Sequence, residues 1–155
     1  MRKRQIHATP NVILRDCTWL DVGNRCSVEV TSEEKGHPIE AALLAEGGPG
    51  WRAAVPGTQI IRLIFDEPQK LQRIWLVFEE LEFPRTQEFV LRSRSENADF
   101  QEIVRQQWNF SPLGSVREVE NYAVELSDVK VLEIIVVPDT NASEARASLR
   151  CLRLA

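Results

Sequence analysis

Histidine and cysteine are scarce in this 155-residue chain. His7 and His37 are its only histidines, and neither lies in a nucleophile motif. The three cysteines, Cys17, Cys26 and Cys151, lack the spacing of metal ligands, and their odd number argues against a disulfide scaffold. The sequence therefore predicts a protein that is not an enzyme, in the reducing environment of the cytoplasm.

An excess of basic residues and a long apolar run are also missing. Nineteen Lys and Arg against 23 Asp and Glu give a net charge of −4, which argues against a nucleic-acid partner. The basic start at residues 1–4 is followed by a polar segment rather than by the apolar stretch of a signal peptide. We therefore predict neither export nor a membrane span.

The chain instead contains short apolar runs that are rich in β-branched residues. Several of them alternate, and residues 131–137 are almost continuously apolar, as in a strand buried on both faces. The predicted strands are residues 26–31, 59–65, 73–78, 88–94, 122–126, 131–137 and 147–154. Together they indicate an all-β protein.

Turn signals separate these runs. Residues 66–68 and 83–86 carry prolines, and residues 95–99 and 139–143 are typical of hairpin turns. A single short helix is predicted at residues 38–45, where a proline begins good helix formers and glycines end them. This spacing predicts a sandwich or barrel. One domain is expected over residues 1–155, with residues 1–10 as a flexible or edge segment.

A family resemblance begins at the predicted helix. The glycine-rich loop Glu46-Gly47-Gly48-Pro49-Gly50 and then Trp51 follow it, before the strands at 59–65 and 71–78. Residues 89–96 and the arginine-bearing last strand continue the pattern, which spans about residues 26 to 154. This order of elements resembles the discoidin family (factor V/VIII type C domains) of the galactose-binding-like superfamily. The resemblance implies a jelly-roll β-sandwich whose end loops bind carbohydrate.

The resemblance also raises the possibility of a calcium ion. Many members of the family carry an aspartate-rich pattern between the helix and the loop, whereas Glu46 is the only carboxylate at residues 45–50. Calcium needs six to eight oxygen ligands, and backbone carbonyls could supply several of them. A structural calcium near Glu46 stays open, and no other cofactor is expected.

Trp51 and Arg52 are the first candidate binding residues. A flat apolar ring beside a guanidinium suits a sugar ring or a planar anion. In the resembling family, however, the tryptophan after this loop commonly packs under the end of the sandwich. We therefore expect Arg52 at the surface, and two interpretations of Trp51 remain.

Two further clusters carry donors and acceptors. Arg85 and Gln87 lie at a turn that enters a strand, and Gln107, Trp108 and Asn109 follow a run of polar residues. Amide groups suit a hydroxyl-rich ligand because they donate and accept at once, and Trp108 would offer a stacking surface. Alternatively, these side chains satisfy backbone groups of the loops.

The sequence thus favours a non-catalytic module that recognises carbohydrate or another small polar ligand. A module that binds a protein partner or a second copy of itself is the alternative. An enzyme would require a pocket that joins Glu or Asp to a histidine or a metal.

Overall fold

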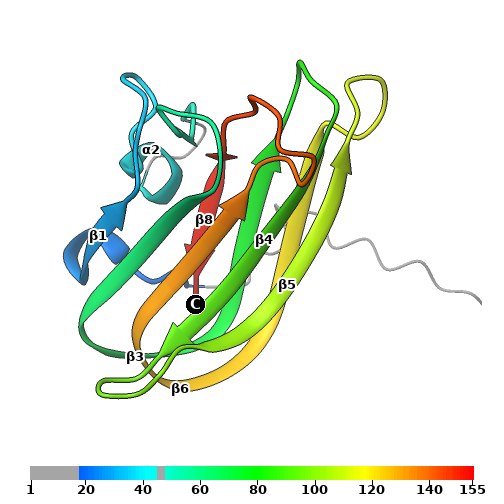
Figure 1. Ribbon diagram of the computed structural model, residues 1–155. Coiled ribbons are helices and arrows are strands. Elements are labelled where there is room, and N and C mark those ends of the chain that lie inside the picture. Colours follow the sequence, from blue (N-terminus) through cyan, green and yellow to red (C-terminus); the bar gives the residue numbers. More distant parts are fainter. Residues whose placement is uncertain (1–17, 45–47) are drawn as a thin grey trace, which may run out of the picture.

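The computed structural model describes residues 18–44 and 48–155 of the chain. Ten elements follow one another in this part of the chain, as Figure 1 shows: η1 (Val22–Asn24), β1 (Cys26–Val30), α2 (Glu40–Leu43), β2 (Trp51–Arg52), β3 (Gln59–Glu79), β4 (Arg85–Arg94), β5 (Gln101–Phe110), β6 (Arg117–Val137), β7 (Ser148–Leu149) and β8 (Cys151–Leu154). No helix in these two ranges has the length and apolar content needed to cross a bilayer.

Two long antiparallel strands, β3 and β6, each take part in both layers of a sandwich. The first part of β3 pairs with β1, and the last part of β6 pairs with β4, which in turn pairs with β5. Beyond a bend the later part of β3 pairs with β8 and with the early part of β6. The predicted all-β sandwich with one short helix is therefore confirmed.

The bend in β3 replaces a predicted turn. The expectation of two strands separated at residues 66–68 is wrong, because the chain stays in one ladder whose register shifts between Ile64 and Arg73. Pro68 lies within this irregular stretch, where a missing backbone N–H breaks no regular pair. Residues 122–126 and 131–137 likewise belong to one strand, β6.

The core fills the space between the two layers. Alternate residues of the paired strands point into it, since successive side chains of a strand face opposite sides. Its largest fully buried side chains include Phe65, Phe78, Phe89, Leu91 and Ile134. The rings of Phe78 and Phe89 approach to 5.0 Å between centroids, and they join the two layers directly.

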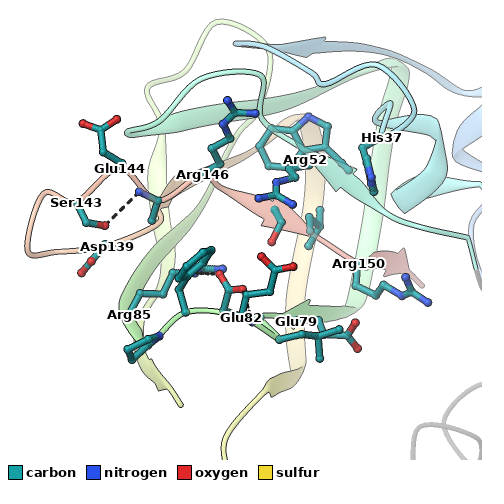
Figure 2. Close-up of a pocket in the computed structure, with 18 of the residues that line it drawn as sticks. His37, Arg52, Glu79, Glu82, Arg85, Asp139, Ser143, Glu144, Arg146 and Arg150 are labelled. Carbon is teal, nitrogen blue, oxygen red and sulfur yellow. Dashed lines mark hydrogen bonds and ion pairs between the residues drawn. The ribbon is translucent and has the colours of Figure 1, made fainter. Parts of the chain in front are cut away.

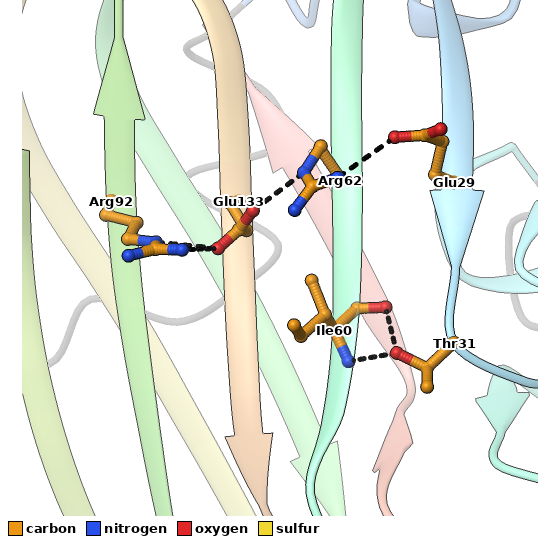
Figure 3. A network of polar contacts seen from close by, with 6 residues as sticks. All are labelled: Glu29, Thr31, Ile60, Arg62, Arg92 and Glu133. Atoms are coloured by element: carbon orange, nitrogen blue, oxygen red, sulfur yellow. Dashed lines mark hydrogen bonds and ion pairs between the residues drawn. The ribbon is translucent and has the colours of Figure 1, made fainter. Parts of the chain in front are cut away.

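Opposite charges alternate across the outer face of the layer that contains β1, β4, β5, the first part of β3 and the last part of β6 (Figure 3). Glu133 of β6 is fully buried there, because Arg62 and Arg92 lie on either side of it. Their Nε atoms donate to its two oxygens at 2.7 and 2.6 Å, and Arg62 also contacts Glu29. A buried carboxylate with two guanidinium partners fixes the register of three strands.

The last strand holds the short helix in place. The Nη1 atom of Arg153 donates to the carbonyls of Ala42 and Leu43 at 2.9 and 3.0 Å. Both carbonyls belong to the last turn of α2, where they lack partners within the helix. The helix covers less than the predicted 38–45; of that range, residue 45 lies outside the described residues.

Two further predictions concern the connections. The predicted hairpin at residues 95–99 does join β4 to β5. Residues 139–143 instead lead from β6 to β7, which pairs with β2 in a separate two-stranded sheet, so the predicted hairpin there is wrong. Strand β5 was not predicted as a strand, since polar residues occupy both of its faces.

Candidate functional site

A cavity of about 570 Å³ lies among the loops at one end of the sandwich (Figure 2). It is lined by His37, by the start of β2, by residues 79–85 between β3 and β4, and by parts of the segment 139–150 that follows β6. Its size is within the range of small-molecule sites. Because four distant segments form it, the whole sandwich positions its walls.

The loop at residues 80–84 forms one wall and presents apolar side chains. Leu81 and Phe83 are 62% and 60% exposed although both are large and apolar. The Glu82 backbone N–H donates to Glu80 at 3.1 Å, which tightens the loop, and Pro84 restricts its exit. The loop is therefore held in a shape that leaves an aromatic ring at the rim of the cavity.

Arg85 connects this loop to the segment that follows β6. Its buried guanidinium donates through Nε to Glu80 at 2.8 Å and through Nη1 to the Pro138 carbonyl at 2.7 Å. It also lies over the Phe110 ring at 4.7 Å. Burial alone would raise the pKa of Glu80, but the hydrogen bond and charge of Arg85, together with the backbone N–H groups of Glu82 and Phe83, outweigh burial and lower the pKa. Arg85 thus fixes the bases of two loops that line the cavity.

Arg85 is linked through Gln87 to the buried carboxyl of Glu118. Gln87 accepts from Arg85 at 3.1 Å and donates to Glu118 at 3.2 Å, and both residues are fully buried. Burial, and then the neighbouring Glu120, raises the pKa of Glu118 to about 8. Glu118 is therefore mostly protonated at neutral pH, although it lies near a guanidinium.

The opposite wall carries exposed guanidiniums. The Arg52 backbone N–H donates to the His37 carbonyl at 3.2 Å, so β2 is held beside the turn that precedes α2. Arg52 and Arg146 both lie near the carboxylate of Glu34, at 3.6 and 3.5 Å. In Figure 2 Arg52 points toward the middle of the cavity, where it faces Glu82. Donors and acceptors thus face each other across the cavity.

Three predicted site residues contact this cavity. Arg52 and Arg85 line it, the first on an exposed wall and the second as a buried support. Trp51 also borders it, but only 1% of this side chain is exposed, and its Nε1 donates to the Ser32 carbonyl at 3.0 Å. Trp51 therefore packs in the core, as one of the two interpretations expected.

The other predicted residues do not line the cavity. Gln87 lies behind Arg85, and Gln107 and Asn109 are exposed on β5, where Asn109 contacts Thr86 at 2.7 Å. Trp108, between them on the strand, points to the other side and packs against the core. Ligand binding by these four residues stays a prediction that the cavity does not support.

The possible calcium site lies outside the described residues, because it was predicted at Glu46. Within 18–44 and 48–155, no three His, Cys, Asp or Glu side chains converge as a metal site requires. Sequence reasoning missed Phe83, Glu82 and Arg146 as site residues. An aromatic residue before a proline in a turn was the one available signal.

The structure thus defines a jelly-roll sandwich with a ligand-sized cavity among its end loops. No family model matches the sequence, and no curated protein matches it. Solved structures do match. The chain is similar to the family 32 carbohydrate-binding module of C. perfringens NanJ in complex with galactose, with a TM-score of 0.64, 14% identity and coverage of 88% of this chain and 97% of that one.

Two further structures show the same likeness. One is CpGH89CBM32-5 from Clostridium perfringens in complex with GalNAc-β-1,3-galactose (TM-score 0.66, 14% identity, 88% and 99% covered). The other is the CBM32 module of AlyQ in complex with 4,5-unsaturated mannuronic acid (TM-score 0.64, 14% identity, 90% and 98% covered). At this identity the comparison shows the fold, which is the galactose-binding-like jelly roll.

Proposed function

We propose that this chain is a non-catalytic module that binds carbohydrate in the cavity between its end loops. The observation that carries the proposal is the exposed Phe83 ring at a cavity whose lining also carries Arg52 and Glu82. A pyranose ring has an apolar face that can pack on an aromatic ring and hydroxyl groups that bond to donors and acceptors. The bound sugars of similarly folded modules support this ligand class.

The side chains of the cavity support binding rather than catalysis. His37 lies at the cavity together with carboxylates, which is the combination that an enzyme would require. Within the described part of the chain, however, no hydrogen bond joins its imidazole to a carboxylate. The carboxyl with the strongly raised pKa, Glu118, lies behind the wall and does not line the cavity.

Phe83→Ala tests the proposal directly. Covering about 60 Å² of the exposed ring at ~25 cal/mol per Å² stabilises a complex by about 1.5 kcal/mol, so the variant should bind about tenfold more weakly. A glycan array identifies the ligand, and calorimetric titration then measures the affinities. Leu113→Ala is the matched control, since Leu113 is 99% exposed and does not line the cavity. Equal losses in both variants, or no glycan bound by the parent chain, would refute the proposal.

The family, the cellular location and a protein partner are also proposals. Membership of the discoidin family, a cytoplasmic location and a protein or self partner are each predicted from the sequence. Incubation with chromogenic glycosides checks the non-catalytic assignment, and any turnover that Glu82→Gln abolishes would contradict it.

A further inference from the structure

The cavity holds more carboxylates than guanidiniums. Its lining carries five carboxylates, Glu79, Glu80, Glu82, Asp139 and Glu144, against the four guanidiniums of Arg52, Arg85, Arg146 and Arg150. Glu34, outside the lining, contacts Arg52 and Arg146. The excess of negative charge lies in a concave space, where charges of one sign raise the local concentration of the opposite ions.

Ion pairs leave mostly carboxylates available to a ligand. Arg52 and Arg146 share Glu34, and Arg85 is paired with Glu80. No ion pair in the described ranges engages Glu79, Glu82 or Glu144 of the lining, and Arg150 is the one lining arginine without a carboxylate partner there. A ligand that enters the cavity therefore meets free negative charge.

Glu82 is the best placed of these carboxylates. It is exposed, and in Figure 2 it points toward the middle of the cavity from the loop at residues 80–84. The next residue, Phe83, presents the exposed ring. A carboxylate attracts a cation through its charge, and the face of an aromatic ring attracts it through the ring quadrupole. The pair combines the two contacts that a positively charged sugar can use.

We propose that the cavity selects amino sugars with a protonated amine over neutral sugars, and neutral sugars over uronic acids. The proposal rests on the proposed carbohydrate-binding function. The amine would lie between Glu82 and the Phe83 ring, and the hydroxyl groups would reach Arg52. A sugar carboxylate would instead enter a site that already has excess negative charge, and like charges oppose binding.

Matched sets of sugars test this order. Each set keeps one ring and changes one group: galactosamine, galactose and galacturonic acid, and the corresponding glucosamine, glucose and glucuronic acid, each also as oligosaccharides. Calorimetric titration at pH 6 should give about five- to tenfold tighter binding of the amine than of the neutral member, with the acid weakest. The preference should shrink as salt increases, because salt screens exposed charges.

Glu82→Gln should remove most of the preference for the amine while the neutral sugar loses less affinity. The control is Glu96→Gln, the same change in an exposed residue of the β4–β5 hairpin at the opposite end of the sandwich. A neutral sugar that binds as tightly as its amine, or an acid that binds more tightly, overturns the amino-sugar inference and leaves the proposed function intact. Failure of every sugar in the sets and on the glycan array refutes both.

Discussion

Replacing Glu118 by Gln should make the protein more stable at high pH and change little at low pH. Glu118 is fully buried, and its pKa of about 8 lies above the value of 4.5 for a free carboxyl. The folded state therefore binds this proton more tightly than the unfolded state does. The resulting stability is complete below about pH 4.5 and is lost as the pH rises toward 8.

The size of the effect follows from the pKa difference. One pKa unit corresponds to about 1.4 kcal/mol, so at pH 7 the loss would reach ~3 kcal/mol. The half-buried Glu120 beside it admits solvent, which screens part of the interaction. We therefore expect Glu118→Gln to be about 1–3 kcal/mol more stable than the parent at pH 8 and nearly equal to it at pH 5. Gln also keeps an oxygen that accepts from Gln87.

Urea denaturation at pH 5, 6, 7 and 8 measures this difference. Titrating groups that do not interact with Glu118 are common to both proteins, so they cancel in the comparison. Glu125→Gln, an exposed carboxyl on the same strand, controls for the loss of one negative charge and should show no such trend. A difference between parent and Glu118→Gln that stays constant from pH 5 to 8 would show that Glu118 is ionised in the folded protein, and the reasoning would fail.

Three further changes test other parts of the structure. Arg85→Met should lower the free energy of unfolding by about 3 kcal/mol, because it leaves Glu80 without its partner, and should weaken sugar binding more than Phe83→Ala does. Glu133→Ala should cost about 3 kcal/mol in urea denaturation, since two arginines lose their shared carboxylate. Gly50→Ala should lower the melting temperature, because φ is +76° and a Cβ would lie 2.7 Å from the Leu149 carbonyl oxygen.

Much of the fold could be predicted from local pattern. β1, β4 and β8 alternate or carry apolar runs, and each lies within or close to its predicted range. The bend at Pro68 could not be predicted, because a proline before a new apolar run indicates a turn unless neighbouring strands hold the chain in a ladder. β5 was missed because it is an edge strand and Gln106 and Gln107 lie on opposite faces of it.

The site was less predictable than the fold. Arg52 and Arg85 were found because each lies beside a turn signal in the sequence. Their ion-pair and hydrogen-bond partners come from distant segments. Glu34, which contacts Arg52, precedes the helix, and Pro138, which accepts from Arg85, follows β6. No periodicity links such residues, so only the folded chain brings them together. Phe83 shows the same limit, since its exposure depends on the loop conformation.

The passage of β3 and β6 through both layers has a consequence for how the chain folds. Gln59 pairs with Val136 and Glu79 pairs with Arg117, so the central ladder joins residues far apart in the sequence. Pairing of this kind costs loop-closure entropy before the new contacts stabilise the chain. Proteins dominated by such pairing fold in milliseconds to seconds. Because β3 and β6 run through both layers, neither layer can form completely without the other. We therefore expect the amide protons of both layers to exchange with solvent in one cooperative step, at a rate set by unfolding of the whole sandwich.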